Sequence, residues 1–211
     1  MGGCAGKSSP VAESMAAMYS AVLGSNKATV PSKFNPAYRY LYVEVPGSPI
    51  SATLVLGYLD STPVGSLETW YSASNEVIKI QNGRIVATTG LQFDWASTTL
   101  TQVPPDWSKI DERGQSYSRV RDVMPDYRFG IREQITVQRT EIPKNLPATV
   151  SRRMAEKWAW FRETQASTTD EVFRDSIFAL GQIEGATAIV YSEQCLSSTF
   201  CLRLQSWPSI E

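Results

Sequence analysis

The sequence predicts a mainly β fold, an antiparallel meander or partly closed barrel-like sheet with a short N-terminal helix packed against it. Strand-forming residues alternate with period two along most of the chain, for example over residues 38–43. Turn signals separate these segments, and the strongest is Asn82-Gly83 between two apolar runs. A clear helical spacing is confined to residues 10–23. These features favour one antiparallel sheet with little helix.

The expected helix begins where Ser9 would cap the N-terminus and Pro10 would occupy the first helical position. Gly24 ends it. An apolar stripe could contact a membrane or a partner, but covering a sheet face is the commoner use of such a helix. We therefore expect the helix to pack against the sheet. The stripe consists of Val11, Met15, Met18 and Val22, with Tyr19 beside it.

Nine or ten strands are expected in the rest of the chain. Residues 90–111 are expected to be irregular, because two adjacent prolines interrupt them. Residues 148–163 fit both periodicities, and we interpret them as a helical turn that enters a strand. The expected strands cover residues 38–43, 52–58, 69–71, 77–80, 84–88, 117–123, 127–139, 186–192 and 200–205.

Composition excludes several classes of protein. The 211 residues include 20 Lys and Arg against 21 Asp and Glu, a balance that does not indicate a nucleic-acid-binding protein. There is no histidine, which excludes Ser-His and Cys-His nucleophiles and His-ligated zinc. Phosphate-loop and dinucleotide motifs are also absent from the sequence, so we expect no cofactor, no metal site and no catalytic residue. We expect a flexible lipid-anchor segment over residues 1–9 and a single β-rich domain over residues 10–211.

Two of the three cysteines indicate a hairpin. Cys195 and Cys201 flank a Ser-Ser-Thr turn between two strand-like arms, which would bring their sulfur atoms within reach of a disulfide. The alternative is a pair of buried, reduced thiols. Because stable disulfides persist outside the cytosol, the predicted bond indicates an exported protein.

The third cysteine has the surroundings of a lipid attachment site. Cys4 follows Gly2-Gly3, and small residues before a near-terminal cysteine are typical of a bacterial lipoprotein cleavage site. We expect Cys4 to carry acyl chains such as palmitate, which together anchor a protein stably to a membrane. No apolar stretch stands before it, so this expectation implies either a start inside a longer signal peptide or a Met1 added to the mature chain. The alternative is an incidental cysteine in a terminal segment.

Charged residues gather around the turn at residues 125–126. Two carboxylates would suffice for a glycosidase, but sequence alone does not pair them. The arginines among the acids favour cross-strand ion pairs on a solvated sheet face instead. The acids are Asp122, Asp126 and Glu133, and the arginines are Arg119, Arg121, Arg128 and Arg132.

Aromatic residues offer a second kind of candidate site. Trp158 and Trp160 would project to the same face of a strand. Such a pair usually belongs to the core. Aromatic rings also stack on sugar rings, so Trp158 and Trp160 are kept as possible contacts with a glycan or a partner.

Taken together, the chain resembles the YjbF/GfcB-like lipoproteins of group 4 capsule and related exopolysaccharide secretion loci. The features that carry this resemblance are Gly3-Cys4 with the short helix after it, and four sequence blocks. The blocks are RYLYVEVPGSPISATLVLGYL, ETWYSASNEVIKIQNGRIVATTGL, SRVRDVMPDYRFGIREQITVQR and VYSEQCLSSTFCLRLQSW. The resemblance covers most of residues 10–207.

The resemblance implies a largely β lipoprotein without an established enzymatic activity. It implies an outer-membrane protein that is anchored through Cys4, faces the periplasm and assists capsule or exopolysaccharide secretion or assembly. Its partners would be outer-membrane polysaccharide export or assembly proteins, with the polysaccharide itself as a further candidate, and no nucleic acid. Two alternatives stay open: a periplasmic enzyme that modifies polysaccharide with carboxylates, and a carrier of lipid or lipoprotein with a hydrophobic cleft.

Overall fold

The protein is a curled antiparallel sheet in the computed structural model, which describes residues 34–124, 126–169 and 172–207. Within these residues, twelve strands form one sheet in the order β5-β4-β3-β2-β1-β12-β11-β10-β9-β8-β7-β6. The strands are β1 (Tyr40–Glu44), β2 (Ser51–Thr62), β3 (Gly65–Tyr71), β4 (Val77–Gln81), β5 (Arg84–Thr89), β6 (Asp94–Leu100), β7 (Gln115–Met124), β8 (Arg128–Arg139), β9 (Ala159–Ser167), β10 (Ser176–Ile183), β11 (Ala186–Cys195) and β12 (Cys201–Trp207).

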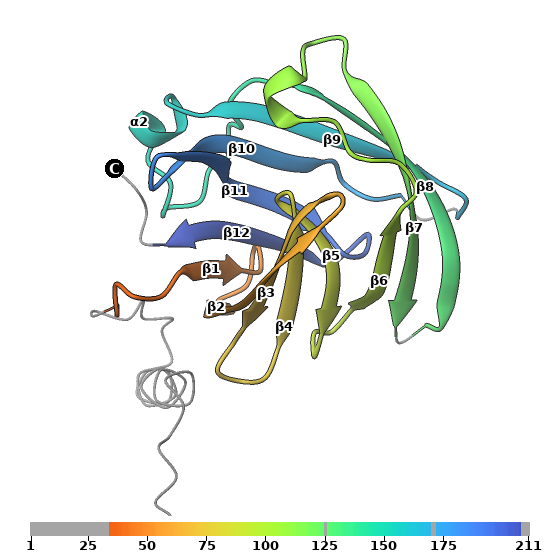
Figure 1. The fold of residues 1–211 in the computed structure, drawn as a ribbon, viewed down its shortest axis with the longest axis horizontal. Coiled ribbons are helices and arrows are strands. Elements are labelled where there is room, and N and C mark those ends of the chain that lie inside the picture. Colours follow the sequence, from red (N-terminus) through yellow and green to blue (C-terminus); the bar gives the residue numbers. More distant parts are fainter. Residues whose placement is uncertain (1–33, 125, 170–171, 208–211) are drawn as a thin grey trace, which may run out of the picture.

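The sheet is almost closed into a barrel (Figure 1). Hydrogen-bonded strands are neighbours in sequence, except that the first and last strands of the sheet, β1 and β12, pair with each other. The two edge strands, β5 and β6, then meet through side chains. Thr88 Oγ1 donates to Asp94 Oδ1 at 2.9 Å, and the Trp95 amide donates to Thr88 Oγ1 at 3.0 Å. The expected β fold is therefore confirmed in its barrel-like form.

Two strands were not expected from the sequence, so the estimate of nine or ten strands is too low for this sheet. Residues 90–111 are not irregular throughout, because β6 and a 3₁₀ turn, η1 (Trp107–Lys109), lie within them. Strand β6 carries serine and threonine instead of an apolar alternation. Strand β10 has a continuous apolar run followed by Gly181, and a run of that kind does not show a period of two.

The ambiguous segment before β9 folds as expected, as a helical turn that enters a strand. The turn is α2 (Arg152–Ala155), and the Ser151 hydroxyl caps it by accepting a bond from the Met154 amide at 3.3 Å. The expected N-terminal helix lies outside the described residues. None of the helices within the described residues has the length and apolarity needed to span a membrane.

The β4–β5 hairpin turns into the barrel and contacts the opposite wall. Its turn residues, Asn82 and Gly83, have positive φ angles of 50° and 80°, as the Asn-Gly signal predicts. A Cβ atom on Gly83 would collide with Ile189 of β11, so this close approach requires glycine. Gln194 of β11 holds the hairpin by donating to the Gly83 carbonyl and accepting from the Ile85 amide, both at 2.9 Å.

Hydrophobic clusters pack on both faces of the β9–β10 pair. Phe161 and Phe178 are opposite each other in the register and pack with Trp107. The next register pair, Trp160 and Ala179, packs instead with the segment between β8 and β9. Because side chains alternate across a sheet, the first cluster fills the barrel and the second lies under that covering segment.

Candidate functional site

An ionic cluster lies inside the barrel. On β7, the buried side chains are Tyr117, Arg119, Arg121 and Val123, which alternate with less buried ones. Their acidic partner, Glu133, comes from β8 and is also buried. The expected cross-strand pairing is confirmed, but the expectation of a solvated face is wrong for these residues. The sheet curls, so the face that carries Tyr117 and Val123 becomes the interior of the barrel.

The other members of the expected charged cluster lie elsewhere. Asp126 and Arg128 form a partly exposed pair, with the Asp126 Oδ2 and Arg128 Nη2 atoms 3.7 Å apart. Asp122 accepts a bond from the Ser97 hydroxyl of β6 at 2.8 Å. Arg132 is exposed. The seven residues therefore do not form a single site.

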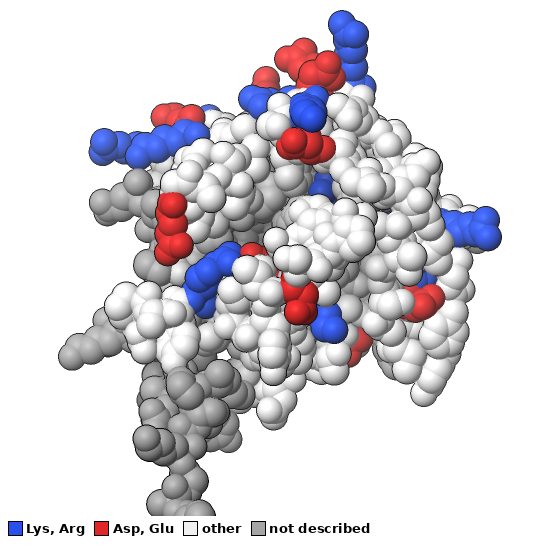
Figure 2. Space-filling view, in the orientation of Figure 1, with Lys and Arg blue, Asp and Glu red and all other residues white. Residues whose placement is uncertain are grey.

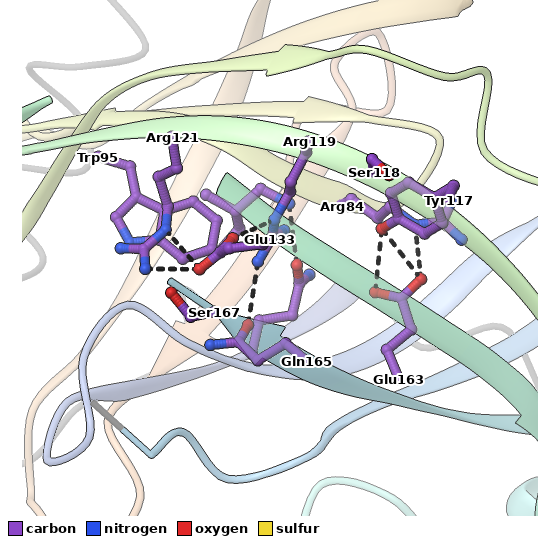
Figure 3. Close-up of polar contacts among 12 residues, drawn as sticks. Arg84, Trp95, Tyr117, Ser118, Arg119, Arg121, Glu133, Glu163, Gln165 and Ser167 are labelled. Atoms are coloured by element: carbon purple, nitrogen blue, oxygen red, sulfur yellow. Dashed lines mark hydrogen bonds and ion pairs between the residues drawn. The ribbon is translucent and has the colours of Figure 1, made fainter. Parts of the chain in front are cut away.

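Both oxygens of Glu133 are held by arginines, as Figure 3 shows. Arg119 Nε lies 2.6 Å from Oε2, and Arg121 Nη2 lies 2.7 Å from Oε1. Both guanidinium groups also lie over the ring of Trp95, at 4.8 and 4.7 Å from its centroid. Each oxygen of the Glu133 carboxylate is therefore bound by a guanidinium group that stacks on Trp95. This arrangement is typical of a structural ion pair and leaves neither oxygen open to a substrate.

A second buried pair lies beside the first. Arg84 Nε of β5 donates to Glu163 Oε1 of β9 at 2.7 Å. The Tyr117 hydroxyl lies 3.3 and 3.4 Å from the two oxygens of Glu163 (Figure 3). Arg84 Nη2 has no hydrogen-bond acceptor within the described part of the chain, but the guanidinium group lies 4.0 Å from the Trp107 ring centroid. The aromatic face supplies part of the missing stabilisation.

The environment keeps the Glu133 carboxyl ionised. Burial alone would raise its pKa, but the charges and hydrogen bonds of Arg119 and Arg121 outweigh burial and lower the pKa below its usual value. Burial raises the pKa of Tyr117, and the neighbouring Glu163 raises it further. At neutral pH, Glu133 is therefore an anion and Tyr117 is a neutral hydroxyl. A general acid would need a carboxyl with a raised pKa.

A cleft opens at the end of the barrel where the β2–β3, β4–β5 and β10–β11 turns lie. One cavity of about 490 Å³ extends into the barrel from this end. A second cavity of about 340 Å³ leads outwards towards Phe34 and Trp207. The two share Arg39, Trp70, Ile183 and Ser206, and together we call them the mouth cleft. Figure 2 shows the molecule from this side, with a hollow near its centre and both acidic and basic side chains around it.

A polar group stands at the junction of the two cavities. Arg39 Nη2 lies 2.7 Å from Glu68 Oε1, and Trp70 Nε1 donates to Glu68 Oε2 at 3.1 Å. The Arg39 guanidinium also lies 5.6 Å from the Trp70 ring centroid. The Arg39 side chain is 39% exposed, so it presents further N–H groups to the cleft and to solvent.

The two tryptophans singled out from the sequence lie together, but not in the mouth cleft. Their ring centroids are 5.9 Å apart, and both belong to the cluster under the β8–β9 segment. Trp160 is 3% exposed, and its indole N–H donates to the Ala155 carbonyl. Trp158 is partly buried against the same cluster. Their placement matches core packing, which is the usual role of such a pair.

The cysteine hairpin is confirmed. Cys195 and Cys201 form a disulfide at the ends of β11 and β12, where they are register partners with Cα atoms 3.8 Å apart. Both cysteines are buried. Cys4 lies outside the described residues.

Sequence reasoning missed charged residues of the interior and the cleft, among them Glu163, Arg84, Arg39 and Glu68. Glu163 had a usable signal, because it lies two positions after buried Phe161 on β9 and so shares its face. Arg84 directly follows the Asn-Gly turn and has no such pattern, since Arg84, Ile85 and Val86 are all buried. Arg39 and Glu68 come from segments far apart in sequence, and only the β2–β3 and β1–β2 pairings bring them together.

The comparisons with known proteins agree with this fold. The family model of the group 4 capsule polysaccharide lipoprotein GfcB, YjbF, matches residues 33–153, more than half of the 211 residues. The crystal structure of the hypothetical lipoprotein YmcC from Escherichia coli K12 is similar, with a TM-score of 0.69 and 17% identity over 98% of this chain and 99% of that one. No curated protein matches the sequence. On the family match, the chain belongs to the YjbF family of group 4 capsule polysaccharide lipoproteins.

Proposed function

We propose that the protein is a non-enzymatic accessory lipoprotein that assists secretion or assembly of a capsule or exopolysaccharide. It would be anchored through Cys4 to the outer membrane and face the periplasm. Membership of a lipoprotein family related to group 4 capsule polysaccharide is the observation that carries this proposal. The Cys195–Cys201 disulfide supports export, because such bonds persist in oxidising compartments.

The protonation state of the carboxylates supports a protein that binds polysaccharide over an enzyme that cleaves it. A glycosidase needs one protonated carboxyl and one carboxylate that reach the substrate. Here the pKa of Glu133 is lowered, and arginines occupy both of its oxygens. In the mouth cleft, hydrogen bonds from the Ser108 amide and hydroxyl lower the pKa of Asp106. These carboxyls lack the protonated form that an acid catalyst needs at neutral pH, which weighs against the polysaccharide-modifying enzyme.

The lining of the mouth cleft also weighs against a lipid carrier. A carrier of acyl chains would need a largely apolar cavity. The wall of this cleft includes the Arg39–Glu68 ion pair and the carboxylate of Asp106. Partner proteins of the export machinery remain part of the proposal, and the exposed loop tips are available to them.

The proposal is tested by deleting the gene in the source strain and measuring polysaccharide on the cell surface and in the medium. We expect secreted polysaccharide to fall and to be restored by the full chain with its signal peptide. A Cys4→Ser chain should restore it poorly and should not incorporate labelled acyl chains. Normal secretion in the deletion strain would overturn the secretion role, and acyl labelling that survives C4S would overturn the anchor.

A further inference from the structure

We propose that the mouth cleft binds an uncharged stretch of a polysaccharide chain. This inference rests on the proposed function and adds the binding site and the chemical class of the ligand. It is carried by the shape of the cleft, by its aromatic wall, by its polar groups and by the sign of its charges.

The shape suits a segment of a chain. The inner and outer cavities, of about 490 and 340 Å³, share wall residues and so form one elongated space. This space begins inside the barrel beside the β4–β5 turn and leads out past Arg39 to Phe34 and Trp207. An elongated cleft of this kind accommodates consecutive units of a linear polymer.

The outer part of the cleft has an accessible aromatic wall. Phe34, Tyr38 and Trp207 all line it and are half-buried, so part of each ring is available to a ligand. The rings of Phe34 and Trp207 brace each other, with centroids 6.3 Å apart. Sugar rings present C–H groups on their faces, and such faces stack on aromatic rings. The wall therefore offers stacking surfaces held in fixed positions.

Polar groups that match hydroxyls stand along the same wall. Ser206 lines both cavities, and Asn35 lines the outer one. Arg39 uses one of its N–H groups for Glu68 and keeps others directed outwards. A sugar hydroxyl both donates and accepts, so it can bond to a guanidinium group, an amide, a hydroxyl or a carboxylate. An acyl chain would leave these groups unsatisfied, at a cost in free energy.

The charges of the wall favour an uncharged segment. Among the described residues that line the cleft, one cation, Arg39, stands against the three carboxylates of Glu68, Asp106 and Glu184. Arg39 is itself paired with Glu68, so the remaining field is negative. A uronic acid or another anionic sugar would meet like charge here, which disfavours its binding.

The experiment is isothermal titration calorimetry of the full chain with oligosaccharide fragments of the strain's own secreted polysaccharide. The fragments are used as isolated and after carbodiimide-mediated reduction of any carboxyl groups to alcohols. The variants are Tyr38→Ala, which removes a ring, and Trp207→Phe, which replaces the indole with a smaller ring and so reduces the stacking surface. Tyr127→Ala is the matched control, because Tyr127 is 71% exposed on the β7–β8 turn at the other end of the barrel. Circular dichroism and thermal melting show whether each variant is folded.

The proposal predicts that reduced or neutral fragments bind, and that Y127A binds as tightly as the unchanged chain. Y38A should weaken binding by about three- to tenfold, and W207F by about two- to tenfold. If Y38A does not fold, W207F decides the outcome. Wild-type affinity in W207F and in a folded Y38A would overturn the site. Tighter binding of unreduced acidic fragments would overturn the ligand class.

A complete lack of binding to any fragment would also overturn this inference. The proposed function would be unaffected by that result, because the secretion measurement in the deletion strain tests it separately. Loss of secretion together with absence of glycan binding would indicate a role through partner proteins alone.

Discussion

Replacing Glu133 with glutamine should destabilise the barrel strongly. Glu133 is 2% exposed and accepts bonds from Arg119 Nε at 2.6 Å, and from Arg121 Nη2 and Nε at 2.7 and 3.1 Å. Glutamine keeps one acceptor oxygen but removes the charge that neutralises two buried guanidinium groups. Breaking a buried ion pair by removing one partner costs about 3–5 kcal/mol. Because the amide keeps some of the bonding, we expect about 3 kcal/mol.

Urea unfolding with the disulfide intact measures this loss. The urea midpoint should fall while the dependence of free energy on urea stays the same, which marks a change in stability alone. For a domain of this size, 1 kcal/mol shifts the melting temperature by about 2–4 °C, so E133Q should melt about 6–12 °C lower. The matched control is Glu156→Gln, because Glu156 pairs with Arg152 on the surface. Such exposed pairs contribute about 0.3–0.5 kcal/mol.

The same variant should also change the response to acid. The pKa of Glu133 is lower in the folded chain, so its contribution is complete above the unfolded carboxyl pKa of about 4.3. That contribution is lost as the pH falls through the lower folded pKa. The unchanged chain should therefore lose more stability than E133Q between neutral pH and pH 3. If E133Q loses less than about 1 kcal/mol of unfolding free energy at neutral pH, Glu133 does not neutralise the two buried guanidinium groups as described.

Three further outcomes are expected. Reducing the hairpin disulfide should cost about 2–3 kcal/mol, because the loop it closes is short; an unchanged urea midpoint in dithiothreitol would contradict this. Gly83→Ala should destabilise more than Gly185→Ala, since both positions have positive φ but only Gly83 lies against Ile189, and equal melting temperatures would show that the close contact relaxes freely. Trp160→Ala should cost about 3–5 kcal/mol in thermal unfolding as a core truncation, and a neutral effect would show that the ring is not part of the core.

The local features of the fold could be predicted because each depends on neighbouring residues. The Asn82-Gly83 turn needs two positive φ angles, which that dipeptide tolerates. The helical turn before β9 and the Cys195–Cys201 hairpin likewise depend on short spacings. By contrast, the β1–β12 pairing and the contact between β5 and β6 depend on how the whole sheet curls, and no short pattern encodes that.

The buried charges show why the site could be predicted only in part. Arg119 and Arg121 occupy the same strand face as Tyr117 and Val123, so a period of two would have placed them on an apolar face. Charged residues are rarely buried unless paired, and the partner Glu133 sits across the strand pair. The charge of these side chains suggested an exposed face. Their position on the same strand face as apolar residues was the more informative signal, because it indicated burial. For Arg39 and Glu68, the pairing across β1, β2 and β3 was needed before any site could be recognised.

We propose that this protein holds a capsule or exopolysaccharide chain without changing it. The most direct test incubates the purified full chain with the strain's polysaccharide and then compares chain length, reducing ends and substituents with an untreated sample. We expect the polysaccharide to co-elute with the protein in size-exclusion chromatography and to be recovered unchanged. Shortened chains, new reducing ends or altered substituents would contradict it and would favour a polysaccharide-modifying enzyme.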